Sequence, residues 1–332
     1  GIIELPEDVE PGRPAAEAMG LADPVIEIEI TPNRGDCLGV RGVARDLAAA
    51  GIGTMKPLNS DPVPGAFESP IKVNLDFKAG TENACPYFVG RYVRGVKNGE
   101  SPKWLKDKLT AVGLRPISAL VDITNLMTID LGRPLHVFDA AKVKGDIQVR
   151  LSNQGEKLLA LDGKEYEMDT EMTVIADATK AEALGGVIGG EASGCTEETV
   201  DVFVEAAYFD PVRTAMTGRK LNLMSDARYR FERGVDPAFL VDGMEIATRL
   251  IIDLCGGEAS ELVTAGSEPD WKRDLTLRVE RIENFGGVKM PKKKITEILT
   301  ALGFGVADGK GPLTVSIPSW RPDIVGEEGL VE

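Results

Sequence analysis

The sequence has little of the chemistry that many enzyme sites use: 332 residues contain one histidine and four cysteines. The cysteines, Cys37, Cys85, Cys195 and Cys255, are far apart and form no CxxC pair, so neither a disulfide framework nor a thiolate zinc site is indicated. HExxH, P-loop and GxSxG motifs are also missing. The common templates for zinc hydrolases, nucleotidases and serine hydrolases are therefore excluded.

Positive charge is also scarce, with 38 Lys and Arg against 53 Asp and Glu and a formal net charge of −15. A broad surface that neutralises phosphates needs a basic face, so we expect any nucleic-acid contact to be local. No apolar run approaches the roughly 18 residues of a membrane span, and no signal-peptide pattern opens the chain. We therefore expect a soluble cytoplasmic protein without a membrane contact. The start at Gly-Ile-Ile and the end at EEGLVE suggest a fragment of a longer protein.

The first 70 residues predict two elements and a linker. VIEIEI at 25–30 alternates apolar and acidic residues, as a half-buried strand does. Asp36 is expected to cap a helix that closes on Gly51. Residues 57–70 are rich in Pro, Ser and Asp, which is typical of a linker.

The segment 71–268 mixes strand and helix periodicities. Ser101 and Pro102 fit the start of one helix, and Asp236 with Pro237 the start of a longer one that ends at paired glycines. An Asp-Gly pair in 158–168 predicts a hairpin. Further strands are expected at 71–77, 87–96, 173–177 and 200–209. Because the strands cluster apart from the helices, the predicted class is multi-domain α+β, with mixed or antiparallel sheets and packed helices.

Residues 272–332 predict a second, smaller α+β module with a helix opened by Pro291 between two strands. Its run Lys292–Lys294 could contact phosphate, although a solvated helix start is the favoured interpretation.

Three features stand out as candidates for a site. Glu205 lies inside VDVFVEAAYF, where alternation puts it on the same face as Phe203 and Ala207. A buried carboxylate needs a cation, a backbone donor or a ligand hydroxyl; the alternative is a solvated edge strand or a salt bridge to a nearby arginine. GGVIGGE at 185–191 fits a tight turn, or a backbone that a carbonyl or carboxylate approaches closely. His136 is either a packing residue or a functional one.

Five stretches, in one order along the whole chain, resemble the beta subunit of bacterial phenylalanyl-tRNA synthetases. They are ITPNRGDCLGVRGVARDLA, VDITNLMTIDLGRPLHVFD, GGVIGGEASG, RYRFERGVDP and PSWRPDI. The resemblance implies part of a first module at 1–56, an editing module at 71–268, and a module related to nucleic-acid-binding folds at 272–332. It also implies tRNA(Phe) and an alpha subunit as partners in an α2β2 enzyme. The alpha subunit would carry out aminoacylation, with ATP and magnesium needed only by the full enzyme.

For the editing module, the resemblance implies hydrolysis of mischarged tyrosyl-tRNA(Phe) by a water molecule, without a cofactor or a covalent intermediate. Glu205 would recognise the tyrosine hydroxyl, and phenylalanine would be the weaker ligand. His136 would orient or activate the water or hold the terminal adenosine, and positioning is favoured over obligate base catalysis. Thr124 is the other catalytic candidate. The remaining expected pocket residues are Asn125 beside the tRNA 3′ end, Gly185 and Gly186 near the amino acid, Ser225 and Ala227 on the opposite wall, and Arg115 as a looser contact.

One departure concerns magnesium. The family continues after PSWRPDI with carboxylates that bind the ion, but here Gly329 replaces one of them and only Asp323 and Glu332 keep ligand positions. Because hard cations need several oxygen ligands, we expect no magnesium in this chain. Two other hypotheses stay open: a scaffold that docks tRNA or a subunit through a vestigial pocket, and an independent duplex-binding module at 272–332, which its near-neutral charge disfavours.

Overall fold

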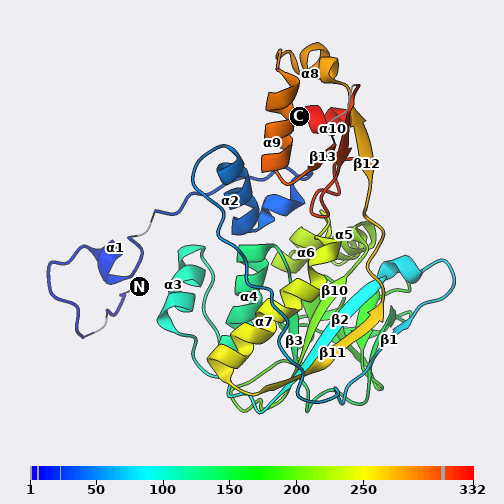
Figure 1. Ribbon diagram of the computed structural model, residues 1–332. Coiled ribbons are helices and arrows are strands. Elements are labelled where there is room, and N and C mark those ends of the chain that lie inside the picture. Colours follow the sequence, from blue (N-terminus) through cyan, green and yellow to red (C-terminus); the bar gives the residue numbers. More distant parts are fainter. Residues whose placement is uncertain (1, 6, 23, 308–310) are drawn as a thin grey trace.

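The structure, a computed structural model, describes residues 2–5, 7–22, 24–307 and 311–332. Its main body has three layers: helices, a four-stranded antiparallel sheet and a second, five-stranded sheet (Figure 1). The four-stranded sheet has the order β11-β2-β10-β3. Its strands are β11 (Glu258–Gly266), β2 (Tyr87–Arg94), β10 (Val202–Tyr208) and β3 (His136–Asp139). The predicted α+β class is confirmed.

Strand β10 explains the layering, because its two faces enter different cores. Val202, Val204 and Ala206 pack with the helices, whereas Phe203 and Ala207 pack with the second sheet. Such strict alternation is the expected pattern for a central strand that is buried on both sides. The helices on the first face are α3 (Lys103–Ala111), α4 (Ala119–Leu131) and α7 (Leu240–Cys255), the last preceded by the 3-10 turn η3 (Pro237–Phe239).

The second sheet has the order β1-β4-β7-β8-β9, with β1 and β4 parallel and the other pairs antiparallel. The Asp-Gly hairpin forms a separate two-stranded ribbon, as the sequence predicts. Two short helices lie beside these sheets and follow β10 in the chain. The bounds are β1 (Val73–Asp76), η2 (Glu82–Ala84), β4 (Ile147–Leu151), β5 (Lys157–Leu159), β6 (Glu165–Glu167), β7 (Thr173–Ala176), β8 (Ala181–Leu184), β9 (Ile188–Gly189), α5 (Pro211–Lys220) and α6 (Asp226–Phe231).

The C-terminal module stands above the main body in Figure 1 and has its own apolar core. Its sheet has the order β12-β14-β13. The helix predicted after Pro291 is α9. The strand expected at LTLRVERI (275–282) forms only in part, because residues 279–282 begin a helix instead. The elements are β12 (Asp274–Leu277), α8 (Val279–Gly286), α9 (Lys292–Ala301), β13 (Gly305–Ala307), β14 (Leu313–Ser316) and α10 (Glu327–Val331).

The N-terminal segment contradicts two predictions. Residues 25–30 form no strand, and Val25, Ile26 and Ile28 are 58%, 80% and 52% exposed. None of the described residues pairs with this segment, and a strand needs a neighbour for its backbone groups. Asp36 does not cap a helix; it binds two arginine side chains instead. The elements here are α1 (Ala15–Ala18), η1 (Gly35–Leu38) and α2 (Val40–Ala49), which begins after Gly39.

Residues 57–70 are extended and packed against the main body. The Ala66 N–H donates to the Ala259 carbonyl, and the Glu261 N–H donates to the Phe67 carbonyl. Gly65 lies so close to β11 that a Cβ there would come within 2.5 Å of the Glu261 nitrogen. Residues 65–67 therefore lie beside β11, while Val63 and Asp61 are hydrogen-bonded to Glu245 and Arg249 on α7. We call 57–70 the strap; its limits at 57 and 70 stay predictions. Within the described residues, no helix has the length and apolar character needed to cross a membrane.

Candidate functional site

The pairing of β3 with β10 brings the two leading candidates together. In the antiparallel register His136 lies opposite Glu205, so both side chains project from the same face of the sheet, toward β7 and β8. The His136 ring also packs edge-on against Phe138, two residues along the strand, with ring centroids 4.4 Å apart. The two groups are thus neighbours on one wall of the site.

A small pocket lies over this pair. Its volume of about 70 Å³ is several times the ~10–15 Å³ that one water molecule needs, so a small polar group can enter. Four of the predicted residues line it: His136, Gly186, Glu205 and Ala227. The other lining residues are Pro134, Leu135, Ile175, Ala183, Leu184, Val187, Ile188, Gly189 and Phe231. The pocket is therefore apolar except at the imidazole, the carboxylate and the backbone.

Glu205 is buried, with 6% of its surface exposed, on a strand that has neighbours on both sides. This placement excludes the solvated edge strand. Within the described residues, burial and the through-space charge of Arg133 act on the Glu205 carboxylate without a hydrogen bond, so the alternative of a direct salt bridge is not realised either. Burial raises the pKa of Glu205 to about 7, against the lowering influence of the Arg133 charge. A buried acceptor without a partner is left for a ligand.

His136 is also held in an apolar setting. Burial lowers its pKa to about 4, so the ring is neutral near pH 7. Its Nε2 atom is buried and has no hydrogen-bond partner among the described residues. Gly189 on β9 permits this packing, because a Cβ at that position would lie 2.3 Å from His136 Cε1. An imidazole with so low a pKa is a weak base, which favours a positioning role.

The two pKa shifts have opposite effects on stability. The unfolded reference values are 4.5 for Glu205 and 6.5 for His136, and the folded pKa values are about 7 and about 4. Between pH 4.5 and 6.5 the folded chain holds one proton on Glu205, and the unfolded chain holds one on His136. The proton numbers match, so this pair adds no net pH dependence to the free energy of unfolding in that window.

Glu205→Gln should reveal the contribution of His136 to the pH dependence of the free energy of unfolding, which Glu205 cancels in the parent. The unfolded variant then binds one more proton than the folded variant, so its free energy of unfolding should rise with pH by up to about 1.4 kcal/mol per pH unit relative to the parent. Urea unfolding near pH 5 and near pH 6 measures this difference. The exposed Glu191→Gln serves as control. Parallel profiles for Glu205→Gln and the parent would contradict these protonation states.

The glycine-rich stretch forms the turn between β8 and β9. Gly186 has φ +70°, and the Val187 N–H donates to the Leu184 carbonyl. A Cβ at Gly185 or Gly186 would meet Phe209 within 3.0 Å, so glycine is required here. The Gly185 N–H already donates to the Thr173 carbonyl, whereas the Gly186 N–H has no backbone acceptor in the described residues. Of the two, Gly186 is the donor available to a ligand.

The other predicted residues lie outside the pocket lining. Ser225 caps α6 and donates to the carbonyl of Val187, so it supports the wall from behind. Thr124 and Asn125 lie on α4, which packs against the other face of the four-stranded sheet, and the Thr124 hydroxyl donates to the Val121 carbonyl. Arg115 is exposed between α3 and α4. Their roles stay predictions.

Sequence reasoning missed Arg133 and Phe231, and it included Gly189 only as part of the stretch 185–191 without naming it. Phe231 and Gly189 line the pocket, and Arg133 is the buried cation that acts on Glu205. Arg133 could have been noticed, because a charged residue within the apolar run LGRPLHVF poses the same question as Glu205. The contributions of β8, β9 and α6 depend on contacts between distant segments, and periodicity carries no such signal.

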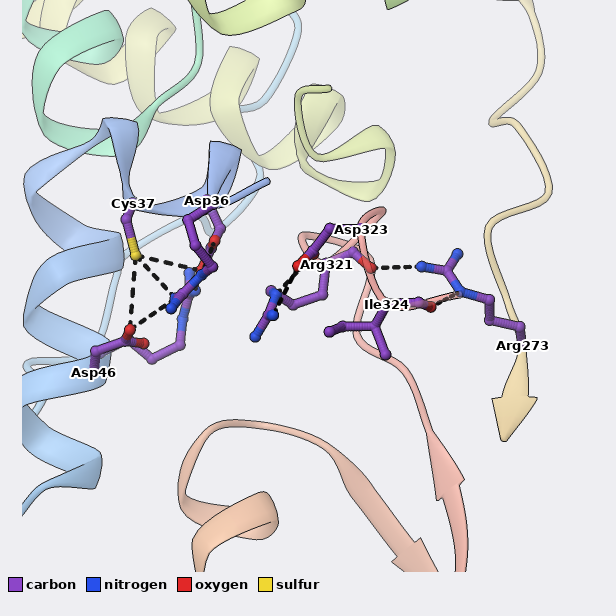
Figure 2. Close-up of polar contacts among 9 residues, drawn as sticks. Asp36, Cys37, Asp46, Arg273, Arg321, Asp323 and Ile324 are labelled. Atoms are coloured by element: carbon purple, nitrogen blue, oxygen red, sulfur yellow. Dashed lines mark hydrogen bonds and ion pairs between the residues drawn. The ribbon is translucent and has the colours of Figure 1, made fainter. Parts of the chain in front are cut away.

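The suggested magnesium ligands do not form a site as they stand. Figure 2 shows Asp323 turned toward Arg321, which donates to both of its oxygens at 2.8 Å. Glu332 is exposed. The grouping of metal-ligand side chains found in the described residues is elsewhere, at Asp36, Cys37 and Asp46.

That cluster already holds a cation from the protein. The Arg34 Nη2 atom donates to Asp36 and Cys37 at 2.9 Å and to Asp46 at 2.7 Å. A guanidinium in this position takes the place that an ion would need, so the cluster is a structural ion pair.

Comparisons with known proteins agree with this architecture. The B3/4 domain family matches residues 84–256, and the tRNA synthetase B5 domain family matches residues 275–332. The chain is 61% identical over its whole length to the phenylalanine–tRNA ligase beta subunit of Paramagnetospirillum magneticum and 55% identical to that of Cereibacter sphaeroides. It spans 42% and 41% of their lengths, respectively.

A crystal structure of an N-terminal fragment of the phenylalanyl-tRNA synthetase beta subunit from Pyrococcus horikoshii is a distant structural match. It has 17% identity and a TM-score of 0.44, with 90% of this chain and 82% of that chain covered. The family matches and the identities over the full chain are much stronger. On these findings, the chain belongs to the phenylalanine–tRNA ligase beta-subunit family and contains its B3/4 and B5 domains.

Proposed function

We propose that the B3/4 domain hydrolyses mischarged tyrosyl-tRNA(Phe) and so supports accurate aminoacylation by a partner alpha subunit. The observation that carries this proposal is the buried Glu205 carboxylate, which has no partner in the described residues and borders an otherwise apolar pocket beside His136. Tyrosine differs from phenylalanine by one hydroxyl, and a hydrophobic aminoacylation pocket discriminates poorly against such an added group. A second site that requires the hydroxyl solves this problem.

The selection follows from hydrogen bonding. Near its pKa of about 7, Glu205 is partly ionised and accepts a hydrogen bond from a phenol hydroxyl. Phenylalanine would remove water from the carboxylate without replacing that bond, which is unfavourable. The neutral His136 next to it would position the attacking water or the ester, and the Gly186 N–H would face the developing oxyanion.

The wider setting is part of the same proposal. The full enzyme would contain tRNA(Phe) and alpha-subunit contacts, use ATP and magnesium for aminoacylation, and work in the cytoplasm. The editing pocket would act through its own side chains. The second candidate is a non-catalytic docking scaffold, favoured by the small size of the pocket, about 70 Å³.

Deacylation separates these two functions. Tyrosyl-tRNA(Phe) incubated with the full synthetase should lose its amino acid much faster than phenylalanyl-tRNA(Phe). The preference for tyrosine should increase as the pH rises through about 7, because ionised Glu205 is the better acceptor. Release of radiolabelled amino acid at several pH values is the measurement. An intact tyrosyl ester at every pH would support the scaffold instead.

A further inference from the structure

The His136–Glu205 pair is the last rung of the β3–β10 ladder. Continued by two residues, the register would set Pro134 opposite Ala207, but proline has no N–H to donate. The Arg133 guanidinium fills this role, because its Nη2 atom donates to the Ala207 carbonyl at 2.5 Å. A side chain therefore extends the ladder where the backbone cannot.

The position of Arg133 is fixed from several sides. Its Nε atom donates to the Pro134 carbonyl at 3.2 Å, so the same guanidinium holds the chain on both sides of the rung. Gly243 on α7 makes room for the aliphatic part, since a Cβ there would be 3.0 Å from Arg133 Cγ. The ring of Phe231, which lines the pocket, has its centroid 5.3 Å from the guanidinium carbon. Arg133 thus forms the support behind the pocket.

Its charge is buried and not neutralised by a direct contact. Arg133 is 1% exposed; within the described residues its Nη1 atom has no hydrogen-bond partner and the side chain has no ion pair. Glu205, Asp236, Tyr208 and Cys85 are the titratable groups that act on it through space. Burial lowers the pKa of Arg133 to about 10, so the guanidinium still carries its charge near pH 7.

The other groups around Glu205 are uncharged near neutral pH. Burial lowers the pKa of His136 on β3 and raises the pKa of the Cys85 thiol well above its usual value. The pocket walls from β7, β8, β9 and α6 consist of apolar and glycine residues. Among the described residues, Arg133 is therefore the charged group that acts on Glu205.

Building on the proposed function, we infer that Arg133 is a positioning residue for recognition of the tyrosine hydroxyl. It holds β3 and β10 together beside the His136–Glu205 pair, and its charge favours the ionised carboxylate. An ionised carboxylate can only accept hydrogen bonds, so it pairs with a phenol hydroxyl and offers nothing to a phenyl ring. Arg133 itself lies outside the pocket lining.

Two substitutions in the full synthetase separate the effect of the Arg133 charge from the effect of its hydrogen bonds to the Pro134 and Ala207 carbonyls. Arg133→Gln retains an amide donor for a carbonyl and loses the charge. The pH at which the tyrosine-to-phenylalanine ratio of deacylation rates is half-maximal should rise by about one unit. At pH 7 the ratio should then fall about fivefold, because the ionised share of Glu205 drops from about one half to about one tenth. Arg133→Lys retains the charge, so its half-maximal pH should equal that of the parent. The deacylation rate should fall, because a compact ammonium lacks the planar fork whose separate nitrogens bind the Pro134 and Ala207 carbonyls.

Arg150→Gln is the matched control, since it removes the charge of an arginine on β4 of the second sheet that is paired with Glu156. It should leave the ratio and the half-maximal pH at parental values. Parental values in Arg133→Gln, or a raised half-maximal pH in Arg133→Lys, would overturn the role of Arg133. The proposed function fails separately, if Glu205→Ala keeps full discrimination in the same assay.

Discussion

Glu205→Ala should lower the preference for tyrosyl over phenylalanyl ester by about 10- to 100-fold, because a hydrogen bond to a charged group contributes about 1.5–3 kcal/mol. The loss should come from slower hydrolysis of the tyrosyl ester. Hydrolysis of the phenylalanyl ester should stay the same or rise, since the variant pocket no longer contains a carboxylate that phenylalanine leaves without a partner. Rates with both charged tRNAs, measured in the full synthetase, give the ratio.

Glu182→Ala provides the control for this experiment. Glu182 on β8 is also buried, and burial also raises its pKa, but it does not line the pocket. Its removal tests whether the loss of any buried acid disturbs the domain. Equal discrimination in Glu205→Ala and the parent would refute the assignment of Glu205 as the residue that recognises the tyrosine hydroxyl. An equal loss of discrimination in Glu205→Ala and Glu182→Ala would refute it as well.

The second large effect concerns folding. Glu245 on α7 binds Arg91 on β2 at 2.7 Å, and both side chains are almost fully buried. The same carboxylate accepts the Val63 N–H, while Arg91 also donates to the Ser260 carbonyl. One ion pair therefore joins the helix layer, the sheet and the strap at 57–70.

Glu245→Ala should lower the free energy of unfolding by about 3–5 kcal/mol, because it leaves a buried guanidinium without its counter-charge. Chemical denaturation followed by circular dichroism measures the change. Asp107→Ala, which breaks the exposed Lys103–Asp107 pair, should cost less than about 1 kcal/mol. The double variant Arg91→Met/Glu245→Leu should recover most of the loss, since the unpaired charge is then gone. A small effect of Glu245→Ala alone would contradict this account.

Prediction from sequence worked best for elements whose structure is determined by residues within the same segment. The alternation around Glu205 placed its side chain with Phe203 and Ala207, and β10 has this arrangement because both of its faces are buried. The Asp-Gly hairpin and the helix after Pro291 are equally local. Turn and capping preferences act within a few residues, so these elements could be predicted without knowledge of the fold.

Prediction failed where a partner was needed. Residues 25–30 have the alternation of a strand, but no described residue pairs with them. Asp36 is a residue type that often caps helices, but its carboxylate forms ion pairs with Arg34 and Arg45 instead. The hydrogen bond from Arg133 to the Ala207 carbonyl could not be predicted, because the two residues are 74 positions apart in the chain.

By itself the sequence determined the α+β class, the family motifs, and the presence of one imidazole and one acid in apolar surroundings. The tertiary structure decided that these two groups form the same rung, although 69 positions separate residues 136 and 205. It also decided their protonation, because a pKa depends on burial and on nearby charges such as Arg133. Local periodicity can assign a residue to a face, but only the packing of distant segments sets the register and the electrostatic surroundings of a site.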